Sequence, residues 1–217
     1  MTIQLSAFRW VPPFAQGFVR DLRLRWALEE AGLAYETVLV DPEIKESEAY
    51  RAWQPFGQVP AYRDETVEMF ESGAIVLHIA AKSETLCPKD AAGRARVVTW
   101  VLAALNSVEP HTAHFIEVVE WHAGEAWAEA RTPQAEARMN DRLASLCAWM
   151  EDGRDYLEGR FTAADIVMAT VLRELEASKA LERFPVLDAY RARCLARPAF
   201  AKALADQLRV FQDNAPA

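Results

Sequence analysis

The chain has 217 residues, 52% hydrophobic and 26% charged, which is enough to bury one large core or two small ones. Its 24 basic and 32 acidic residues give a net charge of −8, and no basic stripe typical of a nucleic-acid-binding protein is present. The longest apolar runs, such as Val101–Leu105, are far shorter than the roughly 18 residues that cross a membrane. Three scattered cysteines without metal-ligand spacing favour a reducing compartment, so we expect a soluble, cytoplasmic globular protein.

The first 85 residues alternate short extended segments with helical ones. Residues 2–8 carry apolar side chains at every second position, the period of a half-buried strand. Residues 21–31 place leucines and a tryptophan opposite Arg23, Arg25 and two glutamates, which predicts an amphipathic helix ended by Gly32. Three more strands and one helix are expected at 35–40, 60–63, 67–70 and 72–81. The order β-α-β, an irregular stretch and then β-β-α predicts a small α/β domain.

From Pro88 onward the pattern is helical throughout. Helices are expected at 94–108, 133–151, 163–178, 185–196 and 198–211. Prolines and glycines separate them, with Pro110 and Pro133 as the first two breaks. We therefore expect a first domain over residues 1–85, a linker near residues 86–90 and an all-helical domain over residues 91–217.

The segment Gln54–Pro60 reads Q-P-F-G-Q-V-P and leads directly into a predicted strand. A residue before proline is pushed toward extended geometry, so Val59 should present its N–H and C=O as a strand does. If the Val59–Pro60 bond is cis, these groups can pair with an extended peptide ligand. The alternative is an ordinary proline-rich loop.

The segment Glu71–Ile75 reads E-S-G-A-I and places Ser72 where a strand ends and a helix begins. The N-terminus of a helix carries unpaired N–H groups and can bind a carboxylate or a phosphate. With Glu71 available for an ammonium, the pair suits an α-amino acid head group. The alternative is a helix cap with an acidic neighbour.

A third motif, F-T-A-A-D over Phe161–Asp165, has the spacing of a capping box between Thr162 and Asp165. We interpret it as a structural helix start, without a chemical role.

The histidines do not predict a metal site. His111 and His114 form an H-x-x-H pair, and on a helix His122 would lie about 12 Å along the axis from His114, too far to share a metal. The pair alone supplies only two ligands.

These motifs, in this order and with the α/β-then-helical division, resemble the glutathione transferase superfamily in its bacterial-type form. The resemblance extends over nearly the whole chain, through the segments Arg25–Glu36, Gln54–Pro60, Glu71–Ile75 and Phe161–Ile166. It implies an α+β thioredoxin-like N-terminal domain, an all-α C-terminal helical bundle, glutathione as co-substrate and a homodimer.

Carried over by position, the resemblance implies that Val59, before a cis Pro60, pairs with the cysteinyl backbone of glutathione. Glu71 and Ser72 would hold the γ-glutamyl head group. Lys45 and Gln58 are candidates for the glycyl carboxylate, Lys45 as a point charge and Gln58 as an amide donor. The alternative for Lys45 is a solvated surface lysine.

The residue that activates the thiol in this superfamily has no counterpart here. Relatives use a serine, tyrosine or cysteine near the end of the first strand or the start of the first helix, because the thiolate is the nucleophile. The serine and cysteine positions fall at Phe18 and Arg20. We expect backbone N–H groups of a helix beginning near residues 17–18 to act, assisted by Arg20 or by the amide of Gln16. The alternative for Arg20 is a surface ion pair with Asp21, which would contribute little.

The leading functional hypothesis is therefore a transferase that joins the glutathione thiolate to a small, partly apolar electrophile, a detoxification chemistry. One alternative is glutathione-dependent reduction of disulfides or peroxides. The other is a non-catalytic member that binds glutathione or a protein partner.

Overall fold

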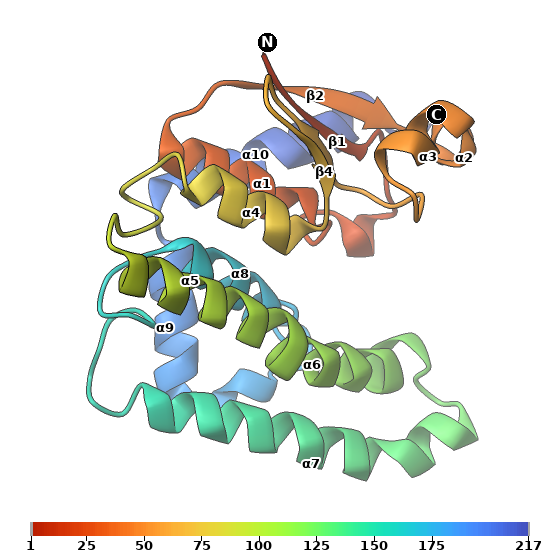
Figure 1. Ribbon diagram of the computed structural model, residues 1–217. Helices are drawn as coiled ribbons and strands as arrows, with labels where there is room; N and C mark the ends of the chain where they lie inside the picture. The colour runs from red at the N-terminus through yellow and green to blue at the C-terminus, as the bar shows by residue number, and fades with distance from the viewer. Residues whose placement is uncertain (1, 217) are drawn as a thin grey trace. The chain divides into compact units, whose positions relative to one another are not determined.

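The computed structural model describes residues 2–216, which form two compact units (Figure 1). The first contains residues 2–86 together with residues 197–216, and the second contains residues 87–196. The sequence-based division placed residues 91–217 together, whereas here the last helix of the chain belongs with the N-terminal segment.

A four-stranded mixed sheet forms the centre of the first unit. Its strands are β1 (Ile3–Phe8), β2 (Tyr35–Val40), β3 (Ala61–Arg63) and β4 (Glu68–Phe70), in the order β2-β1-β3-β4. β2 is parallel to β1, while β3 is antiparallel to both β1 and β4. The strands predicted from alternating apolar residues are confirmed to within one residue at each end, as is the hairpin.

Helix α1 (Asp21–Ala31) is the most buried helix of this unit, and Gly32 ends it with a φ of 67°. Figure 1 shows α1 beside α4 (Ser72–Ala80), and α1 also packs against α10 (Pro198–Asp213). The sequence predicted Arg23 and Arg25 on a polar, solvent-facing side, and this is wrong, because both are only 2% exposed. Helices on two sides of α1 leave no solvent-facing side along its first two turns.

A buried hydrogen-bond network joins α1 to α10. Asp21 is fully buried and accepts from Arg25 Nε at 2.7 Å and from Gln207 Nε2 at 2.6 Å. Burial raises the pKa of Asp21 above its ordinary value, and the bond to Arg25 only partly offsets this. The proposed alternative of an Arg20–Asp21 surface pair is therefore wrong, since Asp21 faces inward.

Two short helices occupy the stretch that the sequence analysis left irregular, α2 (Pro42–Glu46) and α3 (Glu48–Trp53). Asp41 caps α2 by accepting from the backbone N–H groups of Glu43 and Ile44, and Ser47 caps α3. Their first turns carry recognisable start signals, but each helix is too short to show apolar periodicity.

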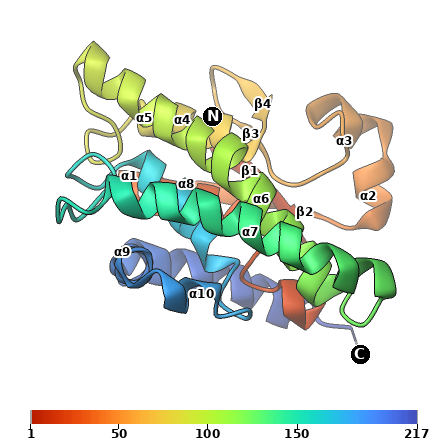
Figure 2. The same cartoon turned by 90° about the horizontal axis from the view of Figure 1, so that it is seen from below.

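The second unit is entirely helical. It contains α5 (Ala91–Ala103), α6 (Glu109–Ile116), α7 (Ala126–Trp149), α8 (Ala163–Arg173) and α9 (Pro185–Leu195). Figure 2 shows α6 running alongside α7. None of the helices in the described part of the chain is long and apolar enough to span a bilayer.

Two prolines do not act as predicted. Pro110 stands in the first turn of α6, where its missing N–H needs no partner, and π-helical turns at Ala104–Val108 join α5 to α6 without an irregular break. Pro133 was predicted to begin a helix but lies inside α7, which starts seven residues earlier at Ala126.

The motif at the start of α8 has the predicted structural role. Thr162 and Asp165 form a capping box, and Asp165 is fully buried. Asp165 also accepts from the Leu157 N–H at 3.0 Å and from the Tyr190 hydroxyl at 2.9 Å. Its four donors tie a loop and α9 to α8, so its role extends beyond that of a cap.

In the first unit, a second buried carboxylate fixes the β3–β4 turn to the end of α4. Asp64 is 7% exposed and accepts from the Tyr62 hydroxyl at 2.9 Å, His78 Nε2 at 2.9 Å and Lys82 Nζ at 3.0 Å. Burial raises the pKa of Asp64, but the hydrogen bonds from His78, Thr66 and Lys82 outweigh it and hold that pKa below the ordinary value of 3.8.

We expect Asp64→Asn to lower the free energy of unfolding by about 1–3 kcal/mol near pH 7, because charge-assisted hydrogen bonds are lost in a buried place. The depressed pKa means that this contribution is fully present above pH 3.8 and is lost as the pH falls toward the lower folded-state pKa. Urea unfolding near pH 7 and near pH 3 should therefore show a smaller difference between wild type and variant in acid. The exposed Asp213→Asn is the control, and an equal difference at both pH values would contradict this account.

Candidate functional site

The loop before β3 is held in a defined turn by its own side chains. The Gln54 side chain is buried and its Oε1 accepts from the Phe56 N–H at 2.7 Å, while the Gly57 N–H donates to the Gln54 carbonyl at 2.9 Å. Gly57 has a φ of 61°, and a Cβ there would lie 2.7 Å from the Arg51 guanidinium carbon. The Val59–Pro60 peptide bond that follows is cis, as predicted.

Two buried hydroxyl groups fix the backbone on either side of this bond. The Tyr50 hydroxyl donates to the Gln58 carbonyl at 2.6 Å and lies 2.8 Å from the Ser6 hydroxyl. Ser6 Oγ in turn accepts from the Ala61 N–H at 2.7 Å. This chain of hydrogen bonds joins β1 and α3 to both ends of the Val59–Pro60 dipeptide.

Val59 itself is positioned by packing. Its side chain is 9% exposed and lies in a small apolar cluster with Val40 and Tyr50, against which Val19 also packs. Within residues 2–216, no hydrogen bond joins the backbone N–H or C=O of Val59 to another group. Their pairing with an extended ligand stays a prediction.

The start of α4 lies at the same end of the sheet. Ala61 pairs with Phe70 across the β3–β4 hairpin, so Glu71 and Ser72 follow directly after the residue opposite the start of β3. Residues paired in this way lie about 4.5–5.5 Å apart at Cα. The register therefore brings together Val59–Pro60 and Glu71–Ser72, which the sequence had singled out separately.

The start of α4 combines a buried arginine, an exposed carboxylate and one residue with a strained backbone. Ser72 is 6% exposed, and its hydroxyl accepts from Arg23 Nη1 at 3.4 Å, which places a buried guanidinium behind it. Glu71 is exposed and has a φ of 72°, a conformation that costs of order 1–3 kcal/mol in a residue with a Cβ. A cationic side chain, helix N–H groups and an outward carboxylate together suit a ligand with adjacent negative and positive charges.

The residues predicted to activate a thiol are arranged differently from the expectation. Helix α1 begins at Asp21, with Arg20 as its N-cap residue, and not near residues 17–18. The Phe18 N–H donates to the Ala15 carbonyl at 3.0 Å, so it is already engaged within the turn. Gln16 Nε2 donates to the Val11 carbonyl at 3.0 Å and holds its own loop. The Arg20 side chain is exposed and remains the candidate cation of this segment.

The two candidates for a glycyl carboxylate lie on different elements. Lys45 is in α2, partly exposed, with Nζ 3.6 Å from the Glu46 carboxylate. Gln58 lies in the loop before β3, and its side chain is exposed while its backbone carbonyl accepts from the Tyr50 hydroxyl. Within residues 2–216 no hydrogen bond joins the two side chains, and their assignment stays a prediction.

The three histidines of the H-x-x-H segment and its continuation, His111, His114 and His122, lie in the second unit. His114 lies 3.3 Å from Glu117, and His122 lies 2.8 Å from Glu125. Burial lowers the pKa of His111, aided by nearby Arg142 and Arg138. Among residues 2–216, no group of three or more metal-ligating side chains is present.

Sequence reasoning missed Ser6, Tyr50 and Arg23. Ser6 and Tyr50 are 44 residues apart, so no local pattern joins them. Arg23 had been assigned to a solvent-facing side of its helix. The one available signal was the polar Ser6 within an otherwise apolar strand, since a buried hydroxyl requires a partner.

Two family models match the chain. The model for "Glutathione S-transferase, N-terminal domain" matches residues 15–81, and that for "Glutathione S-transferase, C-terminal domain" matches residues 108–198. A "Glutathione S-transferase" from Hyoscyamus muticus is 29% identical over 84% of this chain and 92% of its own length. The "Glutathione S-transferase-like protein LUC7" from Fusarium sp. is 31% identical over 67% of this chain and 69% of its own length.

Solved structures agree with these matches. A glutathione transferase from Burkholderia graminis, with two glutathione molecules bound per subunit, is 25% identical with a TM-score of 0.80, over 94% of this chain and 87% of that one. A family member from Pseudomonas fluorescens pf-5 is 24% identical with the same TM-score, over 94% and 92%. These likenesses confirm the predicted fold class, a thioredoxin-like domain and a helical domain. The bacterial-type assignment stays a prediction.

We expect Tyr50→Phe to lower the free energy of unfolding by about 1–3 kcal/mol, because the Gln58 carbonyl and the Ser6 hydroxyl each lose a buried partner. Hydrogen exchange at the Ala61 amide should accelerate by more than the change in global stability accounts for. Tyr190→Phe, which removes one hydroxyl bond to Asp165 in the other unit, is the matched control. If the exchange rate of the Ala61 amide changes only as much as global stability does, the hydrogen bonds through Tyr50 and Ser6 do not fix this loop.

Proposed function

Because the chain belongs to the glutathione transferase superfamily, we propose that it binds glutathione at the common end of β1, β3 and β4 and transfers it to a small electrophile. The observation that carries this proposal is the sheet register, which places the backbone of Val59 beside Glu71 and Ser72. An extended peptide with a zwitterionic end fits both features at once.

The γ-glutamyl end of glutathione supplies a carboxylate and an ammonium. We assign the carboxylate to the Ser72 hydroxyl and the first N–H groups of α4, with the Arg23 guanidinium behind them. The ammonium goes to the exposed carboxylate of Glu71. The cysteinyl N–H and C=O pair with the backbone of Val59, and the glycyl carboxylate goes to Lys45 or Gln58.

In the transfer step, the bound thiol loses its proton to solvent and the thiolate sulfur attacks an electrophilic carbon. A C–S bond forms, and the electron pair leaves with the displaced group or moves onto the adjacent atoms of an activated double bond, which then takes a proton. The thiolate is the reacting form, so a nearby positive charge promotes the reaction by lowering the thiol pKa. With the Phe18 N–H engaged by Ala15, we assign this role to Arg20.

The absence of a serine, tyrosine or cysteine at positions 18 and 20 also supports a second candidate function, a glutathione-binding protein without turnover. Glutathione-dependent disulfide reduction is a third reading, in which bound thiolate attacks a disulfide directly. Conjugation and disulfide-reduction assays on the same preparation separate these activities from binding alone.

We expect Ser72→Ala to weaken glutathione binding by about 1–3 kcal/mol, because a charged ligand group loses a hydrogen-bond partner. Titration calorimetry measures this, and urea unfolding confirms that the variant is folded. Ser145→Ala, on the exposed side of α7, is the matched control. Unchanged affinity in the Ser72 variant would rule out the proposed head-group site.

We expect Arg20→Ala to raise the pKa of the thiol of bound glutathione, because a positive charge beside a thiolate favours the ionised form. Thiolate absorbance of the complex against pH measures the shift. Arg183→Ala, an exposed arginine of the second unit paired with Glu136, removes the same charge and should leave the titration unchanged. If bound glutathione in the wild type titrates like the free thiol, the non-catalytic function becomes the better proposal.

A further inference from the structure

Arg51 lies directly after Tyr50 in α3, and the two side chains hold the loop before β3 at two different points. Tyr50 is buried, and its hydroxyl donates to the Gln58 carbonyl at 2.6 Å. Arg51 Nη1 donates to the Pro55 carbonyl at 3.1 Å, and its side chain is 38% exposed. The segment from Pro55 to Gln58 is therefore held at its first residue by Arg51 and at its last by Tyr50.

Gly57 allows this segment to close over the Arg51 guanidinium. A Cβ at Gly57 would lie 2.7 Å from the guanidinium carbon and 2.9 Å from Nη2, closer than such atoms approach in folded proteins. Any side chain at this position would therefore displace the guanidinium. The φ of 61° at Gly57 is also one that residues with a Cβ rarely adopt. The shape of the loop thus depends on the glycine and the arginine together.

Arg51 also binds α2 through Glu46. α2 and α3 lie side by side (Figure 2), and Arg51 Nη2 pairs with one carboxylate oxygen of Glu46. This hydrogen bond holds the pKa of Glu46 below its ordinary value. Lys45 Nζ lies 3.6 Å from the other oxygen of the same carboxylate. Because Arg51 offsets the charge of Glu46, Lys45 retains its attraction for a further anion.

Arg51 thereby acts on both candidates for the glycyl carboxylate of glutathione. It acts on Lys45 through Glu46, and on Gln58 through the loop that begins at Pro55. Val59 is held separately, by its packing against Val40 and Tyr50. A change at Arg51 therefore alters the glycyl end of the site and leaves the contacts of Val59 in place.

We propose that Arg51 is a positioning residue that makes this site select a thiol peptide with a carboxylate one residue beyond the cysteine. Glutathione is such a peptide, whereas γ-glutamylcysteine ends at the cysteine. This inference rests on the proposed function, glutathione binding at Val59, Glu71 and Ser72. Arg51 acts through Lys45 and Gln58, since its two terminal nitrogens are engaged by Glu46 and the Pro55 carbonyl.

The test compares the affinities of glutathione and γ-glutamylcysteine for the full chain, measured by titration calorimetry. The wild type should bind glutathione more tightly. Arg51→Ala should weaken glutathione about tenfold and γ-glutamylcysteine by less than about twofold, because only glutathione has the glycyl carboxylate. Equal weakening of both peptides would show a general structural role and overturn the proposal. A wild type that binds both peptides equally well would also overturn it while leaving the head-group site intact, and one that binds neither would overturn the proposed function too.

Two further variants test positioning without removing the charge. Gly57→Ala should narrow the difference between the two peptides in the same way, because its Cβ displaces the guanidinium. Arg51→Lys should also narrow it, since one ammonium cannot reproduce the fork that reaches Glu46 and Pro55 together. A wild-type difference in either variant would overturn the proposal, because a positive charge at residue 51 would then suffice.

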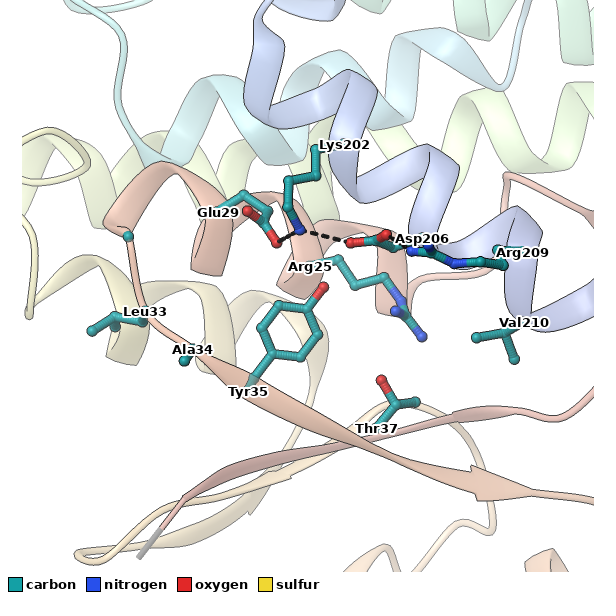
Figure 3. A pocket seen from close by; sticks show the side chains of 11 residues that line it. Arg25, Glu29, Leu33, Ala34, Tyr35, Thr37, Lys202, Asp206, Arg209 and Val210 are labelled. Carbon is teal, nitrogen blue, oxygen red and sulfur yellow. Dashed lines mark hydrogen bonds and ion pairs between the residues drawn. The ribbon is translucent and has the colours of Figure 1, made fainter.

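Arg209→Ala is the matched control. Figure 3 shows Arg209 beside Asp206 on α10, where the two form an exposed ion pair in the same unit as Arg51. This variant removes the same charge and should leave both affinities unchanged. Urea unfolding checks that every variant is folded, and Arg51→Lys decides the matter if Arg51→Ala does not fold. A narrowed difference in Arg209→Ala would show that loss of any arginine charge has this effect, and would overturn the proposal.

Discussion

The contact between the hydroxyl groups of Ser6 and Tyr50 is the interaction on which the proposed glutathione site depends. It joins the central strand to α3 and, through the Gln58 carbonyl and the Ala61 N–H, fixes the backbone on both sides of Val59 and Pro60. Both hydroxyls are buried, so each would be costly without the other. The backbone of Val59, two residues before β3, is thereby held in one orientation, as recognition of an extended peptide requires.

Helix α1 carries two buried arginines that bind different partners. Its first two turns are buried on all sides, so its arginines are held by neighbouring groups and not by solvent. Arg23 donates to Ser72 at the start of α4, while Arg25 donates to Asp21. Burying a guanidinium is unfavourable unless it is paired, so both positions carry a constraint that a surface arginine would not.

The first unit also depends on α10, which follows the second unit in the chain. Gln207 donates to Asp21 and to the Val19 carbonyl, just before α1 begins. Arg197 forms two hydrogen bonds with Glu30 near the other end of α1. The start of α1, where we place thiol activation by Arg20, is therefore held by residues nearly 190 positions away. The homodimer and the small, partly apolar electrophile stay predictions.

The sequence by itself determined the strands, the helices flanking the sheet, the cap at Thr162 and the two motifs at Val59–Pro60 and Glu71–Ser72. These features are encoded by neighbours within a few residues, through apolar periodicity, proline geometry and capping. Only the tertiary structure decided that Arg25 is buried, that Phe18 has its N–H engaged, and that α10 completes the first unit. Those outcomes depend on which segments pack together across the chain, because burial and pairing of a polar group are set by distant residues that no local pattern specifies.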